Sequence, residues 1–160
     1  MSVSRLPPLP LRLRAVAAAV PAGARSVADV GAGDGQLARH LAARGLRVVA
    51  TERRAPSFAR LRAAVPELDC RIGEGLDVLR PGEVEGVVLA GLGGHSIVRI
   101  LEASPAVACA LDWLVLQPQQ HADRLVAWLE PAGYQLRARE TAAQGRRSYT
   151  VLLVAGHERS

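Results

Sequence analysis

The chain has 160 residues, of which 49% are hydrophobic and 22% charged, the balance of a single globular domain rather than of a disordered or fibrous protein. Its 20 basic residues, all arginine, outnumber 15 acidic ones, and the net charge of +5 favours a polyanionic partner such as RNA over a membrane surface. No apolar run approaches the ~20 residues of a membrane span and no signal peptide is recognised, so we expect a soluble, cytoplasmic protein.

Helix and strand patterns alternate along most of the chain. Apolar residues at helical spacing predict helices, and short apolar or β-branched runs predict strands. In chain order we expect a helix at 11–20, a strand at 26–31, a helix at 35–45, a strand at 46–52, a helix at 57–65, strands at 68–73 and 84–91, a helix at 94–103, a strand at 111–117 and a helix at 122–133. Strands at 134–142 and 148–156, joined through A-Q-G-R-R, predict a terminal hairpin.

This order predicts an α/β fold with a doubly wound sheet of seven strands. The sheet is expected to be parallel except for one antiparallel strand from the C-terminal hairpin, with helices on both faces. We expect residues 1–24 to form an N-terminal helical segment and residues 25–160 to form the ligand-binding domain, within a single domain overall. Ligands of such sheets bind at the carboxyl ends of the strands, near the switch point beside the first strand.

The glycines that follow the first strand discriminate between cofactors. A dinucleotide-binding loop has the spacing G-x-G-x-x-G, which would require a glycine at Gln36. Gly31, Gly33 and Gly35 instead have the spacing G-x-G-x-G, typical of class I S-adenosylmethionine (SAM) methyltransferases, and Asp29 is the acidic residue that opens this motif. We expect the loop amides and the Asp29 carboxylate to meet the carboxylate and ammonium groups of the methionyl end of SAM.

Two later strand ends supply further candidate ligands of SAM. Glu52 lies 19 residues after Gly33, where its carboxylate can accept hydrogen bonds from both ribose hydroxyls. The structural alternative is an ion pair with Arg53 or Arg54. Glu74, in R-I-G-E-G-L, could accept a hydrogen bond from the adenine amino group, although Gly-Glu-Gly is also an ordinary turn. The predicted cofactor-binding residues are Asp29, Gly31, Gly33, Asp34, Gly35, Glu52, Arg53, Glu74, Gly75 and Ala90.

Cysteines and histidines form no metal-binding pattern. Cys70 and Cys109 belong to no CxxC or Cys/His spacing, and we expect both to be buried free thiols. The four histidines are scattered along the chain, so no metal site is predicted.

The loop after the fourth strand reads V-L-A-G-L-G-G-H-S-I, and its glycines would let a flat ligand approach the backbone closely; a flexible loop before a helix is the alternative. This A-G-L-G-G loop, followed by L-V-L-Q-P-Q at 114–119 and preceded by L-R-L-R-A-V-A-A-A-V-P-A-G, V-A-D-V-G-A-G-D-G and R-I-G-E-G-L, resembles the bacterial tRNA (adenine-22-N1)-methyltransferase family, TrmK. That family typically shows A-G-M-G-G and then L-Q-P-N; here Gln119 replaces the Asn.

The resemblance implies a Rossmann-like class I domain that uses SAM to methylate N1 of an adenine in tRNA. It implies that the target base is lined by Gly91, Gly93, Gly94, Gln117 and Pro118. No dedicated general base is predicted, because adenine N1 has an in-plane lone pair and placement with desolvation can supply most of the acceleration. A paired or stacked adenine would first be flipped out.

Arginines are the expected contacts to tRNA phosphates, and the candidates are Arg12, Arg14, Arg54, Arg146 and Arg147. Solvated surface charges are the alternative interpretation of each one. We expect the C-terminal coiled-coil domain common in the TrmK family to be absent. Two other functions remain open, a SAM-dependent methyltransferase with a different substrate and a non-catalytic SAM-binding or RNA-binding module, and the sequence leaves the oligomeric state undetermined.

Overall fold

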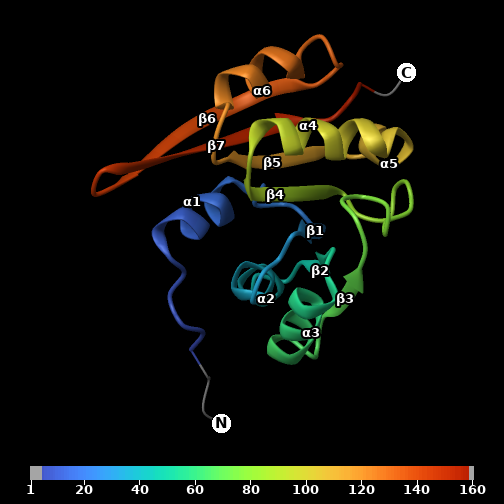
Figure 1. Ribbon diagram of the computed structural model, residues 1–160, viewed down its shortest axis with the longest axis vertical. Coiled ribbons are helices and arrows are strands. Elements are labelled where there is room, and N and C mark those ends of the chain that lie inside the picture. The colour runs from blue at the N-terminus through green and yellow to red at the C-terminus, as the bar shows by residue number, and fades with distance from the viewer. Residues whose placement is uncertain (1–4, 159–160) are drawn as a thin grey trace.

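Residues 5–158, which the computed structural model describes, form one sheet with helices packed on both of its faces (Figure 1). The strands are β1 (Ser26–Val30), β2 (Arg47–Glu52), β3 (Asp69–Ile72), β4 (Gly86–Leu92), β5 (Trp113–Pro118), β6 (Gln135–Gln144) and β7 (Arg147–Ala155). The helices are α1 (Leu11–Ala19), α2 (Gln36–Ala43), α3 (Ala55–Ala64), α4 (Gly94–Ala103), α5 (Pro105–Cys109) and α6 (Ala122–Leu129).

Within those residues the sheet has seven strands in the order β3-β2-β1-β4-β5-β7-β6. Neighbours from β3 to β5 pair in parallel, whereas β7 is antiparallel to both β5 and β6. The predicted α/β class and the single antiparallel strand from the hairpin are therefore confirmed. The strand order reverses between β1 and β4, so a crevice opens at the carboxyl ends of these two strands.

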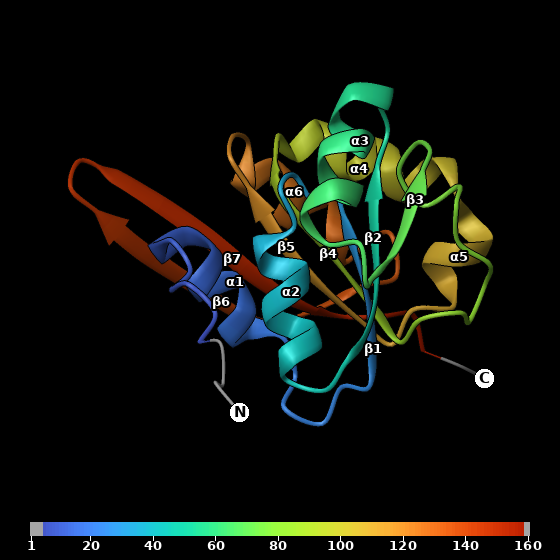
Figure 2. The same cartoon turned by 90° about the horizontal axis from the view of Figure 1, so that it is seen from below.

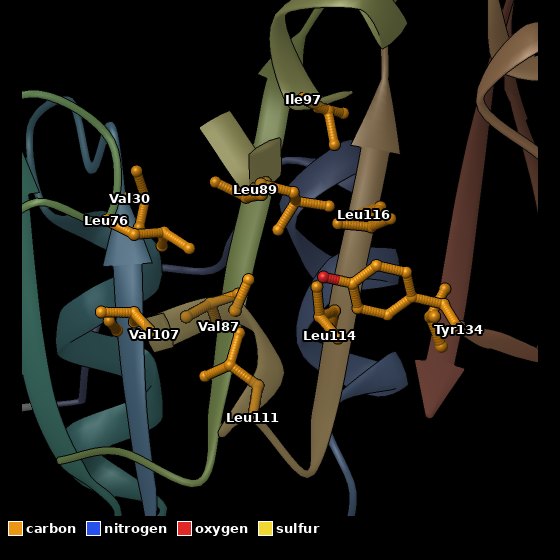
Figure 3. Packing of buried hydrophobic residues seen from close by; sticks show 14 of the residues in the cluster. Val30, Leu76, Val87, Leu89, Ile97, Val107, Leu111, Leu114, Leu116 and Tyr134 are labelled. Atoms are coloured by element: carbon orange, nitrogen blue, oxygen red, sulfur yellow. The ribbon is translucent and has the colours of Figure 1, made fainter. Parts of the chain in front are cut away.

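Alternation along the central strands divides the core between the two faces of the sheet. On one face, Val87 and Leu89 pack with residues of α4, α5 and α6, and Figure 3 shows this cluster from close by. On the other face, Val88 packs with residues of α1, α2 and α3. Both faces of β1, β4 and β5 are covered, which explains why these strands read as nearly continuous apolar runs.

The N-terminal helix belongs to this core rather than lying apart from it. Val16 and Ala17 of α1 are buried in the same cluster as Leu41 of α2 and Val115 of β5. Figure 2 shows α1 lying beside α2, and Figure 1 shows it below the β6–β7 hairpin, whose strands it contacts. The position of α1 therefore depends on the sheet, and its residues can reach the strand ends.

Several predicted boundaries differ from the observed ones for local reasons. Helix α3 begins at Ala55, two residues before the expected start at 57, because Pro56 is accommodated in the first turn. The five-residue helix α5 was not predicted, since it is too short to show a helical period. The observed α6 ends at Leu129, before the predicted stops at Pro131 and Gly133.

The predicted burial of both cysteines is wrong. Both are free thiols, as expected, but Cys70 is only half-buried because β3 is the edge strand of the sheet. Cys109 is exposed at the end of α5, although its neighbours Val107 and Ala108 are buried. An apolar sequence around a cysteine did not reveal which side of a short helix the thiol would occupy.

The β6–β7 hairpin projects beyond the body of the domain (Figures 1 and 2). Its outer residues are exposed on β6 and on the first part of β7, and Arg146 and Arg147 lie at its tip. None of the helices in residues 5–158 combines the length and the apolar content needed to cross a membrane.

Candidate active site

A cavity of about 540 Å³ lies at the carboxyl ends of β1, β2 and β3 and is closed on one side by α4. Five predicted cofactor-binding residues line it: Gly31, Glu52, Arg53, Glu74 and Gly75. The remaining wall was not predicted, and it comprises Val30, Thr51, Gly73, Leu76, Asp77, Leu92, Ser96, Arg99, Ile100, Ala103 and Ser104. The residues from α4 were missed because they follow an ordinary amphipathic pattern.

The glycine loop folds back over the end of β2. The amides of Gly31 and Ala32 both donate to the Thr51 carbonyl at 3.0 Å, and the amide of Gly33 donates to Oε1 of Glu52 at 2.6 Å. Gly31 and Gly33 have positive φ values of 74° and 61°, and a Cβ on either would meet no other atom within 4 Å. These two glycines therefore border open space, as a loop that receives a ligand requires.

Gly35, the third glycine of the motif, has a different environment. It is the buried N-cap of α2, with a φ of 81°. A Cβ added at this glycine would lie only 2.8 Å from Cγ1 of Val65. This glycine therefore packs against the end of α3 and does not line the cavity.

We expect Gly35→Ala to lower the free energy of unfolding by about 2–4 kcal/mol, because it combines left-handed backbone strain with overpacking. Urea denaturation would measure the loss. The matched variant Gly33→Ala, which has backbone strain but open space around its Cβ, should lose only about 1–2 kcal/mol. Equal losses for the two variants would contradict a packing role for Gly35.

Asp29 is buried on β1, and its Oδ2 has no hydrogen-bond partner among the described residues. The pKa of this carboxyl is raised to about 7, chiefly by burial and also by the nearby Glu52 carboxylate, while the Arg12 guanidinium acts to lower it. Asp29 does not line the cavity, but it lies two residues before Gly31, which does. A buried carboxylate without a partner suits a cationic ligand group.

The other acidic candidates are held in defined contacts. Glu52 accepts a hydrogen bond from the loop rather than forming the alternative ion pair. Arg53 pairs instead with Glu74, with Nη1 and Oε1 at 3.7 Å, and both residues line the cavity. Asp34 is exposed, and its Oδ2 accepts a hydrogen bond from Nε2 of Gln36 at 2.7 Å.

The predicted target-base residues gather where β4 and β5 end, outside the cavity. Gln117 is fully buried, and its Oε1 accepts hydrogen bonds from the Gly91 amide and from Nη1 of Arg12, each at 2.9 Å. Gly94 begins α4, and a Cβ there would lie 2.6 Å from the carbonyl oxygen of His121. Gly93 borders open space.

Two further predicted residues also lie in this region. In the β4–β5 register, Ala90 is paired with Gln117, and Pro118 with Leu92 across a β-bulge. Leu92, which is paired with Pro118, also lines the cavity, so the cavity and the predicted target-base loop meet there.

The candidate arginines do not form one cluster. Arg14, Arg54, Arg146 and Arg147 are exposed on α1, at the start of α3 and at the hairpin tip. Arg12 instead is half-buried and turned toward Gln117. In the described part of the chain, no three or more His, Cys, Asp and Glu side chains gather as a metal ion would require.

Comparison with known proteins identifies the family. Residues 9–152 match the methyltransferase-domain family. The tRNA (adenine(22)-N(1))-methyltransferase of Bacillus subtilis (strain 168) is 33% identical over 92 residues, 58% of this chain and 39% of that protein, so the match spans about two fifths of the curated relative.

Solved structures extend the similarity to nearly the whole chain. The Bacillus subtilis tRNA methyltransferase TrmK has a TM-score of 0.86 and 29% identity, covering 96% of this chain and 68% of that one. Streptococcus pneumoniae Sp1610, in complex with S-adenosyl-L-methionine, has a TM-score of 0.86 and 28% identity, covering 96% and 76%. The chain therefore belongs to the methyltransferase-domain family, and its fold is that of a TrmK-like class I methyltransferase.

Proposed function

We propose that the protein is a SAM-dependent methyltransferase that methylates N1 of an adenine in tRNA. The observation that carries this proposal is the open Gly31–Gly33 loop, which is bonded to Glu52 beside a cavity at the switch point of the sheet. The similarity to Bacillus subtilis TrmK, whose substrate is tRNA, supports the target. A tRNA substrate would place the protein in the cytoplasm.

The residues present fit SAM. The cavity volume of about 540 Å³ lies within the ~300–1,000 Å³ typical of cofactor sites. Glu52 and Glu74 line this cavity and would hold the adenosine part, because carboxylates accept hydrogen bonds from ribose hydroxyls and amino groups. The unpartnered Asp29 carboxylate and the amides of the open loop suit the ammonium and carboxylate of the methionyl end.

When bound, SAM supplies a methyl group on a positively charged sulfonium, which is already activated for transfer. The protein then has to position the adenine and exclude water from it. Gly93, where a Cβ would meet open space, leaves room for a flat base beside the loop backbone. No side chain is assigned as a general base, because N1 of adenine offers a lone pair without losing a proton.

Charge supports tRNA as the proposed partner, in addition to the similarity. The net charge of +5 and the exposed Arg14, Arg54, Arg146 and Arg147 provide the cations that a phosphate backbone requires. Contacts of this kind orient an RNA without reading its sequence, so the choice of target adenine depends on the site itself.

The decisive experiment incubates the purified protein with labelled SAM and an unmodified tRNA transcript, followed by nucleoside mass spectrometry. The proposal requires 1-methyladenosine in the digest. SAM binding with no tRNA product would indicate a methyltransferase with another substrate. Affinity for SAM or tRNA without turnover on any substrate would indicate a non-catalytic binding module.

We expect Glu52→Gln to raise the Kd for SAM about 10- to 100-fold, since it removes the charged acceptor from both the loop and the ribose. Isothermal titration calorimetry would measure this change. Glu74→Gln is the matched control, with an expected change of less than about fivefold, because Glu74 is exposed and the glutamine oxygen can still accept a hydrogen bond from the adenine amino group. Unchanged SAM affinity in Glu52→Gln would show that the cofactor lies elsewhere.

A further inference from the structure

The side chain of Arg12 joins two parts of the molecule that lie far apart in the sequence. Its Nη1 donates a hydrogen bond to Oε1 of Gln117 at 2.9 Å, and the two residues are separated by 105 positions. Gln117 is fully buried, and the same Oε1 also accepts a hydrogen bond from the Gly91 amide at 2.9 Å. Its Nε2 donates a hydrogen bond to the Pro118 carbonyl at 3.3 Å. The buried amide thus has partners for both of its polar atoms.

The backbone at Gly91 is shaped to receive the Arg12 guanidinium. Gly91 has φ of 73° and lies at the β-bulge between Ala90 and Leu92, where the ladder to β5 changes register. A Cβ at Gly91 would lie 3.3 Å from Nη1 of Arg12, so the guanidinium rests directly against this backbone. The start of the Gly91–Gly94 loop is therefore held by Arg12 and Gln117 together.

Asp29 and Gln117 lie on the same face of the sheet as Arg12. Val27 of β1 and Val115 of β5 pack in the cluster formed with α1, so Asp29 and Gln117, each two residues further along its strand, lie on that same face. The positive charge of Arg12 acts on the Asp29 carboxyl and lowers its pKa, against the opposing effects of burial and Glu52. Arg12 is thus a cation near both the target loop and the cofactor loop.

We propose that Arg12 is a positioning residue that holds the Gly91–Gly94 loop for the target base by way of Gln117, rather than a contact to tRNA phosphates. This inference rests on the proposed function. Removal of a charged donor leaves Gln117 Oε1 with one bond fewer in a buried position and lets the loop backbone move. Loss of the arginine should therefore act on the transfer step, while SAM and tRNA still bind.

The test compares three arginine-to-alanine variants by steady-state kinetics on tRNA and by SAM and tRNA binding. Arg12→Ala is expected to lower kcat about 10- to 100-fold, with Kd values for SAM and tRNA within about threefold of the wild type. Arg14→Ala, on the exposed side of the same helix, should weaken tRNA binding instead. Arg60→Ala, on the surface of α3, should change neither quantity.

A conservative variant and a double variant distinguish a positioning role of Arg12 from a general loss of structure. Arg12→Lys, which keeps the charge and one possible bond to Gln117, should recover part of kcat. The double variant Arg12→Ala/Gln117→Met should be no slower than the slower single variant, because both changes break the same contact. A rise in the KM for tRNA at unchanged kcat, with a reduced salt dependence, would overturn the proposal and make Arg12 a phosphate contact.

Hydrogen exchange gives a readout that does not depend on activity. In peptides covering residues 88–97, Arg12→Ala should increase amide exchange, whereas Arg60→Ala should not. Faster exchange in Arg12→Ala without any tRNA methylation by the wild type would support the contact and refute the proposed function. Unchanged exchange together with unchanged kcat would refute the role of Arg12 while leaving the proposed function intact.

Discussion

Asp29→Asn is expected to weaken SAM binding at least about 100-fold and, at the same time, to stabilise the folded protein above pH 7. The carboxyl is buried and its Oδ2 has no partner in the described structure, so its ionised form is costly until a cation arrives. Asparagine keeps the shape of the side chain but carries no negative charge. It therefore removes both the free-energy cost of a buried carboxylate and the attraction for an ammonium group. Calorimetric titration of SAM and urea denaturation at pH 8 would measure the two effects.

The contribution of Asp29 to the stability of the folded protein should depend on pH. Burial raises the pKa of Asp29 from 3.8 to about 7, so between these values the folded protein holds a proton that the unfolded chain has lost. The contribution of Asp29 to stability therefore falls as pH rises from about 4 to 7. The stability advantage of Asp29→Asn should be largest above pH 7 and should shrink as the pH falls toward 4.

SAM affinity of the wild type should follow the opposite course. Pairing with an ammonium group requires the ionised carboxylate, so affinity should fall by up to about tenfold per pH unit below 7. Asp34→Asn is the control, because Asp34 is exposed in the same loop. SAM affinity retained by Asp29→Asn would show that the acidic residue of the motif does not hold the cofactor.

The parts of the site that the sequence predicted are those encoded in short stretches. The glycine loop, the carboxylate at the end of β2 and the turn at Gly75 each follow a strand directly, so they reach one edge of a parallel sheet whatever the remaining packing is. Gly31, Glu52 and Glu74 do line one cavity. The succession of strands and helices along the chain and the terminal hairpin were also predicted, because they depend on short local patterns as well.

The parts that could not be predicted depend on contacts between distant residues. Gly35 continues the glycine spacing, yet it packs on Val65, which lies 30 positions later in the chain. Arg12 looked like one more surface arginine in a chain with 20 of them, and its contact with Gln117 needs both α1 and β5 in place. The cavity wall on α4 carries no local signal, since Ile100 is an ordinary position of an amphipathic helix.

The projecting hairpin allows a direct test of the proposed tRNA binding. Arg146 and Arg147 lie at its exposed tip and do not line the cavity, and Figure 2 shows the hairpin extending past α1. A cationic arm of this kind can contact a polyanion that is too large to fit within the crevice of the sheet. Its contribution should therefore be to tRNA binding and not to the binding of SAM.

Charge reversal at the tip, Arg146→Glu/Arg147→Glu, is expected to weaken tRNA binding about 10- to 100-fold at low salt while SAM affinity stays unchanged. The slope of log Kd against log salt should fall by about two, one for each phosphate that the arginines no longer neutralise. Filter binding across a salt series would measure both quantities. The matched variant Arg60→Glu/Arg62→Glu makes the same change in net charge on the exposed side of α3. Equal weakening by both pairs would mean that tRNA responds only to net charge, and the hairpin would then have no specific role.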